Sequence, residues 1–197
     1  STPQYGNYLE IVFHSPIPRY LANSLLVAVS VAAIQVMCCS FFAYGVTFMR
    51  IRGRDMLFRL VLFTYMVPTA VTYIPCYIIL SRMGLLDSYQ GLILSNGVSV
   101  LGIFLLRQAF EAVPMETMEA ARMDGAGHFR ILTGVVFPMT RPSFVTFILL
   151  SFINTYNSYM WPSLITDDTN LSLVSQGLRQ FFIEGGAYGT NWSLVMA

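Results

Sequence analysis

The feature that most constrains this chain is a series of four apolar stretches, each about as long as a membrane crossing. They cover residues at about 24–48, 56–80, 91–110 and 142–161, and a transmembrane helix needs about 20 apolar residues. Only 11% of the residues are charged, whereas soluble domains carry about 25%. Because so few charges cannot cover a surface that faces water, the sequence predicts an all-α membrane protein, a polytopic helical bundle with four complete spans.

The two ends of the chain are expected to belong to elements that the sequence contains only in part. Residues 1–22 predict an extracytoplasmic segment that follows a missing first helix, and residues 23–197 predict the membrane domain. The residues from Trp192 to Ala197 predict the start of a further span, which the sequence truncates.

The basic residues predict the orientation of the spans, and all eleven of them are arginines. The loops after the first and third stretches, with the residues next to them, hold Arg50, Arg52, Arg54, Arg59, Arg107, Arg122, Arg130 and Arg141, and the other side holds Arg19, Arg82 and Arg179. Cytoplasmic loops carry the excess of basic residues. We therefore expect residues 111–141 to lie in the cytoplasm, and residues 85–90 and 162–191 to face outward.

Composition and spacing argue against several kinds of function. A chain without lysine has no Walker A phosphate loop, because the lysine of that loop reaches the terminal phosphates. A net charge of +1 with no basic run gives no indication of nucleic acid. His14 and His128 are isolated, so no metal site is expected. No cluster of catalytic residue types supports a membrane-embedded enzyme.

The interiors of the predicted spans are polar in places but contain no Asp, Glu, Lys or His. Ion-coupled secondary transporters usually keep ionisable groups at that depth, although sodium sites made of backbone carbonyls need none. A secondary transporter is therefore the less favoured alternative. The neutral polar residues are Gln35, Ser40, Thr64, Thr69, Thr72, Ser95, Asn96, Ser99, Thr146, Ser151, Asn154, Thr155, Asn157 and Ser158.

One group of these residues is too dense to face a single neighbouring helix. Asn154, Thr155, Asn157 and Ser158 place four polar groups in five positions. With Asn96, they predict a wet path for a neutral, hydroxyl-rich solute. The alternative is that each side chain bonds across helices and serves packing alone.

Two prolines, Pro68 and Pro75, interrupt the second apolar stretch. Each removes a backbone hydrogen bond, and the freed carbonyl needs a partner in protein or water. A kink beside a translocation path and a kink that serves only packing both account for them.

The cytoplasmic loop contains the pattern of a short amphipathic helix. Pro114 suits its first turn, and Gly125 suits its end, where a positive φ is common. Met115, Met118 and Arg122 recur at spacings of three and four, so they share a face. Methionines on such a face favour docking of another protein. A helix that lies on its own subunit is the alternative.

The same loop resembles the EAA loop of ABC importer permeases. That pattern is Glu-Ala-Ala, three residues, Gly, nine residues, Ile, one residue, Leu and Pro. The matching residues here are Glu119, Ala120, Ala121, Gly125, Val135, Phe137 and Pro138, with conservative departures at Val135 and Phe137. The phrases at residues 86–89 and 161–162 resemble the carbohydrate-uptake branch, the second permease of maltose or glycerol-3-phosphate importers.

The resemblance implies a MetI-like permease fold in the bacterial cytoplasmic membrane and a subunit that is not an enzyme. It implies three kinds of partner besides lipid: an ATPase dimer that holds ATP and Mg²⁺, a second homologous permease, and an extracytoplasmic solute-binding protein. Glu119 would pair with a basic group of the ATPase. The residues assigned to coupling are Met115, Met118, Glu119, Ala120, Ala121, Asp124, Gly125 and Pro138. The expected solute is a sugar or related polyol; amino acids or peptides are the alternative.

Overall fold

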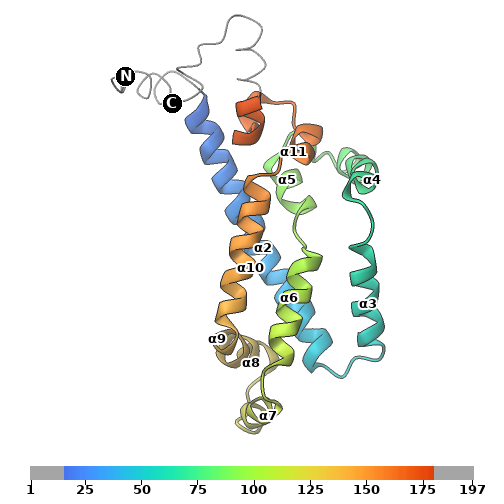
Figure 1. Cartoon of the computed structure of the whole chain (residues 1–197), viewed down its shortest axis with the longest axis vertical. Helices are drawn as coiled ribbons and strands as arrows, with labels where there is room; N and C mark the ends of the chain where they lie inside the picture. The colour runs from blue at the N-terminus through green and yellow to red at the C-terminus, as the bar shows by residue number, and fades with distance from the viewer. Residues whose placement is uncertain (1–15, 180–197) are drawn as a thin grey trace, which may run out of the picture.

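A computed structural model describes residues 16–179 of the chain, and every regular element in this range is a helix (Figure 1). The expected all-α class is therefore confirmed for the described part of the chain. The start of a further span at Trp192 and most of the expected outer segment 1–22 lie outside the described residues.

The elements follow one another along the chain with short connections. They are α2 (Ile17–Phe48), α3 (Arg54–Thr64), α4 (Thr69–Arg82), α5 (Tyr89–Ser95), α6 (Val100–Glu111), α7 (Met115–Met123), α8 (His128–Ile131), the π-helix η1 (Leu132–Val136), α9 (Phe137–Met139), α10 (Arg141–Tyr156), α11 (Met160–Ile165) and the 3₁₀ helix η2 (Thr169–Leu171).

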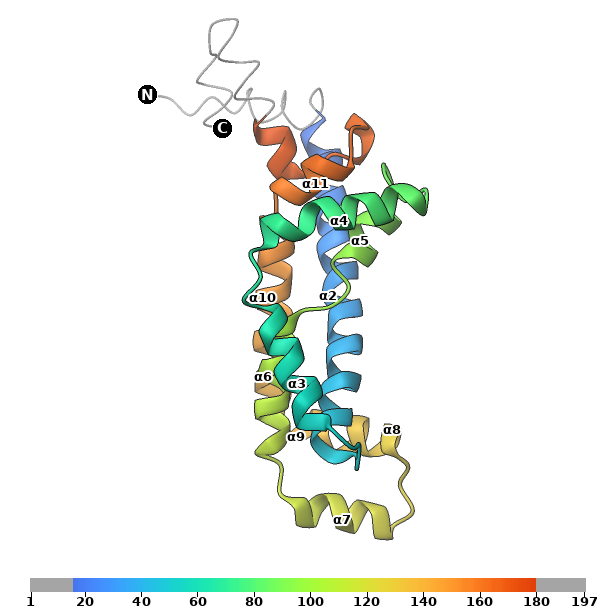
Figure 2. The same ribbon diagram turned by 90° about the vertical axis from the view of Figure 1, so that its right-hand side faces the viewer.

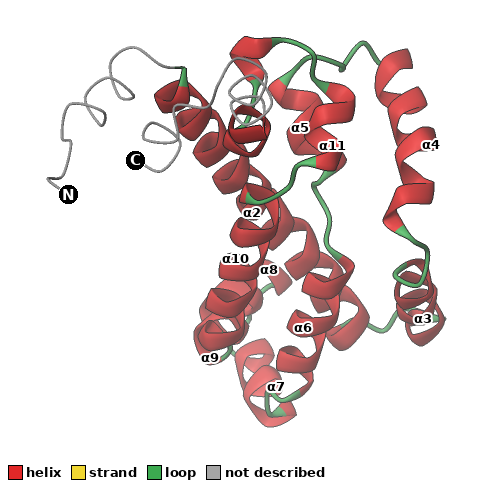
Figure 3. Cartoon of the chain, turned by 45° about the horizontal axis from the view of Figure 1, so that its top comes forward, coloured by secondary structure: helices red, strands yellow, loops and turns green. Residues whose placement is uncertain are grey.

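The central element is α2, which packs mainly against α6 and α10 (Figure 3). It begins at Ile17, earlier than the expected start near residue 24, because Pro16 and Pro18 suit the first turn of a helix. Its 32 residues are more than a bilayer core requires. The side chains of Ala28, Cys39 and Ala43 are fully buried, and such small residues let neighbouring helices approach closely.

The stretch 56–80, expected as one span, forms two helices instead. Helices α3 and α4 are bent by 100° relative to one another, so α4 runs across the molecule (Figure 2). Pro68 is the N-cap of α4 with an extended ψ of 129°. Proline also disfavours helical geometry in the residue before it, which accounts for the break. Pro75, by contrast, lies inside α4.

The third and fourth apolar stretches are also interrupted. Residues 91–110 form α5 and α6, bent by 48°, and the hydroxyl of Ser99 accepts a hydrogen bond from the Gly102 amide to start α6. Residues 142–161 form α10, which ends at Tyr156, and the first residues of α11. Within residues 16–179, one helix is long and apolar enough to cross a membrane, or up to four crossings exist if each bent pair is one span. The number of complete spans stays a prediction.

The two ends of the molecule differ in which loops they carry. Helices α7, α8 and α9 lie at one end together with the connection from α2 to α3, and α4, α5 and α11 lie at the other (Figures 1 and 2). The arginine-bearing loops thus meet at the same end, as the orientation predicted from the sequence requires.

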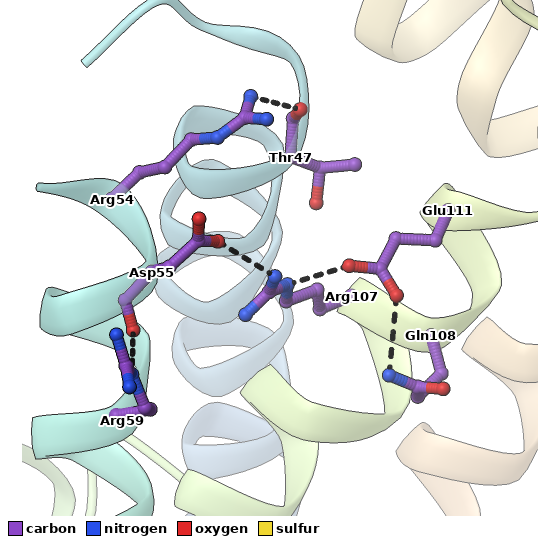
Figure 4. Close-up of polar contacts among 7 residues, drawn as sticks. All are labelled: Thr47, Arg54, Asp55, Arg59, Arg107, Gln108 and Glu111. Atoms are coloured by element: carbon purple, nitrogen blue, oxygen red, sulfur yellow. Dashed lines mark hydrogen bonds and ion pairs between the residues drawn. The ribbon is translucent and has the colours of Figure 1, made fainter. Parts of the chain in front are cut away.

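One arginine fastens α3 to α6 at this end. The Arg107 guanidinium pairs with the Asp55 carboxylate at 3.2 Å and with the Glu111 carboxylate at 2.9 Å (Figure 4). It also lies over the ring of Phe58, 3.8 Å from the centroid. Phe58 is the buried residue of α3, so this cluster attaches α3 to α6 through both charge and ring contacts.

The contact between α6 and α10 depends on a glycine, which yields a first prediction. A Cβ at Gly102 would lie 2.1 Å from the ring of Phe147, and Phe147 is fully buried. We expect Gly102→Ala to lower the free energy of unfolding by about 1–3 kcal/mol through overpacking. Thermal unfolding of the detergent-solubilised protein measures the effect. Gly134→Ala is the matched control, because a Cβ there meets nothing within 4 Å. Equal melting temperatures for the two variants would contradict the prediction.

Candidate functional site

The helix predicted in the cytoplasmic loop is present as α7, and Gly125 ends it. Gly125 has a φ of +75°. Its amide donates to the Arg122 carbonyl at 3.0 Å, and the Ala126 amide donates to the Ala121 carbonyl at 3.0 Å. These two bonds form a Schellman motif, which satisfies the carbonyls at the end of a helix and favours glycine. The chain therefore turns sharply after α7, as expected from the sequence.

Helix α7 lies on its own subunit with one face and is exposed on the other. Met118 is fully buried in a core that includes Phe48 and Phe110. Met118, predicted to lie on a docking face, is instead inside the protein. Residue spacing shows which side chains share a face but does not show whether that face is turned inward or outward. Met115 and Met123 remain exposed, Met123 at 89%. The expected docking surface therefore excludes Met118.

Glu119 lines an open groove at this end of the molecule. The groove has a volume of about 860 Å³, and we call it the cytoplasmic groove. It is lined by Thr47, Phe48, Met49, Arg50, Ile51, Arg52, Arg54, Met115, Glu119, Arg122 and His128. Within residues 16–179, the ion pairs closer than 4.0 Å are those of Arg107, so Glu119 makes none. Its carboxylate is exposed and available to a cationic group of a partner.

Two polar contacts connect α7 and α8 to α2. Arg122 Nη2 donates to the carbonyl oxygen of Phe48 at 3.4 Å, and Phe48 is the last residue of α2. The hydroxyl oxygen of Tyr44, in α2, lies 3.1 Å from Nδ1 of His128, in α8. These contacts join α7 and α8 to the last turns of α2.

The loop reaches α10 through an irregular helical segment that contains Pro138. The π-helix η1 precedes Pro138 and α9, and the segment from His128 to Met139 meets α10 at 88°. A proline ring clashes with the carbonyl four residues earlier in an α-helix. The wider π-turn before Pro138 relieves that clash. The predicted coupling residue Pro138 thus lies at the bend between the loop and α10.

A second polar region lies in the middle of the helical bundle. It is a cavity of about 140 Å³, which we call the central cavity. It is lined by Gln35, Asn96, Ser99, Leu101, Phe147, Leu150, Ser151, Asn154, Thr155 and Ser158. The structure therefore brings together four of the five residues predicted for a solute path, and Asn157 is absent from the lining. Asn157 follows the last residue of α10, where the chain turns toward α11.

Gln35 of α2 organises the central cavity. Its Nε2 donates to the Asn96 carbonyl oxygen at 2.7 Å, and its Oε1 accepts from the Ser151 hydroxyl at 2.8 Å. It thus joins α2, the break between α5 and α6, and α10. The sequence identified Gln35 and Ser151 as interior polar residues and did not place them at the site, since a lone polar residue in an apolar run has no spacing signal.

The central cavity contains hydroxyl and amide groups and no charge among its described lining residues. Such groups can exchange hydrogen bonds with a neutral polar solute or with water. They offer no ion pair to a charged one.

Comparisons with known proteins point to one family. The family of binding-protein-dependent transport system inner membrane components matches residues 20–195. The sn-glycerol-3-phosphate transport system permease protein of Yersinia pestis is 34% identical over 183 residues, which are 93% of this chain and 65% of that protein. The corresponding protein of Brucella abortus is 31% identical over 197 residues, covering 96% of this chain and 70% of that protein. The chain thus spans less than the full length of these relatives.

A solved structure has the same fold. It belongs to a bacterial ABC transporter involved in the import of the acidic polysaccharide alginate. One of its chains matches with a TM-score of 0.86 at 25% sequence identity, covering 98% of this chain and 71% of that chain.

The position of Gln35 yields a second prediction. Gln35→Met keeps the side-chain length but leaves the Asn96 carbonyl and the Ser151 hydroxyl without their partner. We expect the free energy of unfolding to fall by about 2 kcal/mol, the cost of burying unsatisfied polar groups. Thermal unfolding in detergent measures it. Gln108→Met is the control, because Gln108 is exposed. A loss for Gln35→Met no larger than the control would show that water replaces the missing amide.

Proposed function

Because the chain belongs to the family of binding-protein-dependent transport system inner membrane components, we propose that it is a permease subunit of an ATP-binding-cassette importer. It lies in the bacterial cytoplasmic membrane and conducts solute without chemical change. The observation that carries the proposal is the geometry of α7. This helix exposes Glu119, which lines the cytoplasmic groove and forms no ion pair with residues 16–179, and Arg122 joins the same helix to the end of α2.

The proposed partners are those that an importer of this family works with. A cytoplasmic ATPase dimer binds ATP and Mg²⁺, a second homologous permease completes the path, and an extracytoplasmic protein delivers the solute. Closure of the ATPase dimer moves α7. The movement passes to α2 through Arg122 and to α10 through the bend at Pro138, and the helices change from inward-open to outward-open.

The proposed solute is a sugar or related polyol. The relatives are named for sn-glycerol-3-phosphate and the structural neighbour for alginate, and both solutes carry hydroxyl groups. The uncharged lining of the central cavity supports a hydroxyl-bearing solute and gives no support to amino acids, whose charged ends need ionic partners. An ion-coupled secondary transporter lacks support because no Asp, Glu or His lines the described central cavity.

The role of Glu119 yields a third prediction. We expect Glu119→Lys to abolish ATP-driven uptake while the subunit remains inserted, because a cation there repels the basic group that Glu119 meets on the ATPase. Uptake by the purified importer in ATP-loaded liposomes measures the effect. Glu116→Lys is the matched control, since Glu116 lies on the same exposed helix but outside the cytoplasmic groove. Uptake within twofold of the unmodified protein for Glu119→Lys would exclude the docking role.

The central cavity yields a fourth prediction. Asn154 lines the cavity and Asn157 does not, so we expect Asn154→Ala to lower solute uptake about fivefold through loss of one neutral hydrogen bond. Asn157→Ala should leave uptake unchanged. Initial rates in liposomes with matched amounts of inserted protein give the comparison. Equal rates for both variants would return Asn154 to a packing role.

A further inference from the structure

A groove that is larger than the central cavity opens next to it, toward the end of the molecule opposite α7. We call it the outer groove; its volume is about 760 Å³. It is lined by Thr64, Tyr65, Met66, Val67, Pro68, Thr69, Thr72, Tyr73, Cys76, Ser95, Asn96, Val98, Val100, Ser158 and Trp161. Asn96 and Ser158 also line the central cavity, so the two spaces adjoin.

Three interruptions of helical backbone meet at the outer groove. They are residues 65–68 between α3 and α4, residues 96–99 between α5 and α6, and residues 157–159 between α10 and α11, and each contributes lining residues. Non-helical backbone at membrane depth is tolerated where it is buried in protein or lines a wet cavity. Because these three breaks line an open groove, a space that holds water or a polar solute accounts for them.

Part of the polar lining presents acceptor oxygens. Thr72 Oγ1 donates to the Thr69 carbonyl at 2.7 Å, and Asn96 Nδ2 donates to the Leu92 carbonyl at 2.9 Å. These donors are thus used within the chain, and the Thr72 oxygen and Asn96 Oδ1 remain as acceptors. Hydroxyl groups of a solute are the donors that such acceptors need.

Four other lining hydroxyl groups are free, whereas those of Thr64 and Ser95 donate to carbonyls of their own helices. The side chains of Tyr65, Thr69, Tyr73 and Ser158 make no hydrogen bond with the described part of the chain. A free hydroxyl can donate and accept at once, which is also what each hydroxyl of a sugar does.

The ring of Tyr73, backed by the buried Trp161, forms an aromatic wall of the groove. Tyr73 stacks on Trp161 with ring centroids 5.3 Å apart and an interplanar angle of 27°. Trp161 Nε1 donates to the Ser95 hydroxyl at 2.9 Å, which holds the indole in place. Aromatic side chains combine a large apolar surface with a polar tip. Such a wall suits the apolar C–H face of a sugar ring, whose rim carries hydroxyls.

No charged residue is among the described residues that line the outer groove. We infer that the outer groove is a binding site for the ring of an uncharged carbohydrate, and that this chain supplies no cation for a phosphate or carboxylate group. The inference deepens the proposed function and rests on it. It names this groove as the place where the subunit recognises its solute, and a neutral sugar as the class.

The first arm of the test identifies the solute. The importer, assembled with its ATPase, second permease and binding protein, is reconstituted in ATP-loaded liposomes. It is offered radiolabelled neutral mono- and disaccharides and, as the acidic probe, sn-glycerol 3-phosphate. ATP-dependent uptake of a neutral sugar is the expected result. Uptake of the phosphate ester alone would overturn the inference and leave the importer function standing. Uptake of none would overturn both.

The second arm locates the site with matched variants and the transported sugar. Thr72→Val removes an acceptor in the groove. Its control is Thr146→Val, because Thr146 is also exposed and donates to its own helix, to the Pro142 carbonyl at 2.9 Å, but lies outside the groove. We expect uptake at subsaturating sugar to fall about fivefold for Thr72→Val and by less than twofold for the control.

A second pair of variants tests the aromatic wall. Tyr73→Leu should lower uptake about tenfold, and Tyr73→Phe, which keeps the ring and loses only the hydroxyl, should lower it less. Tyr77→Leu on the same helix should leave uptake unchanged, since Tyr77 lies outside the groove lining. The ATPase rate without sugar and the amount of inserted protein are measured for each variant. If the ATPase rate and the amount of inserted protein fall in parallel with uptake, Tyr73 stabilises the fold, and its role at the site is overturned. Equal uptake for Tyr73→Leu and Tyr77→Leu would overturn the site itself.

Discussion

The structure depends on one constraint, which is that backbone polar groups within a membrane must find partners inside the protein. Helix α2 provides many of them without losing its own continuity. Gln35 donates a hydrogen bond to the Asn96 carbonyl in the break between α5 and α6. Cys39 Sγ lies 3.4 Å from the Ser99 carbonyl of the same break. Nearer the N-terminus of α2, Asn23 Nδ2 donates to the carbonyls of residues 170 and 172. The unbroken helix thus stabilises interruptions in the others.

Helix α2 also connects α7 with the central cavity. Helix α7, the proposed coupling helix, is joined by Arg122 to the last residue of α2. The central cavity is organised around Gln35, farther along the same helix. A displacement of α7 therefore acts on the element that also holds the polar residues of the cavity in place.

Much of the fold and part of the site could be predicted from the sequence. Apolar length identified the helical segments, and the turn at Gly125 followed from glycine chemistry. The breaks could not be placed in this way, because hydropathy averages over a window; proline marks only the break at Pro68, and the break at Asn96 contains none. Spacing put Met118 and Met115 on one face, yet only packing decides which is buried. The same holds for Asn154 and Asn157, which differ in whether they precede or follow the end of α10.

The α3–α4 segment contacts the rest of the molecule through the Arg107 cluster on α3 and, on α4, through the stack of Tyr73 on Trp161 and the buried Leu80. Between them, side chains such as Phe63 and Met66 are exposed at 67% and 78%. Residues 65–68 join the two helices as non-helical backbone, and they line the outer groove. A change in the 100° angle between α3 and α4 therefore changes the shape of that groove.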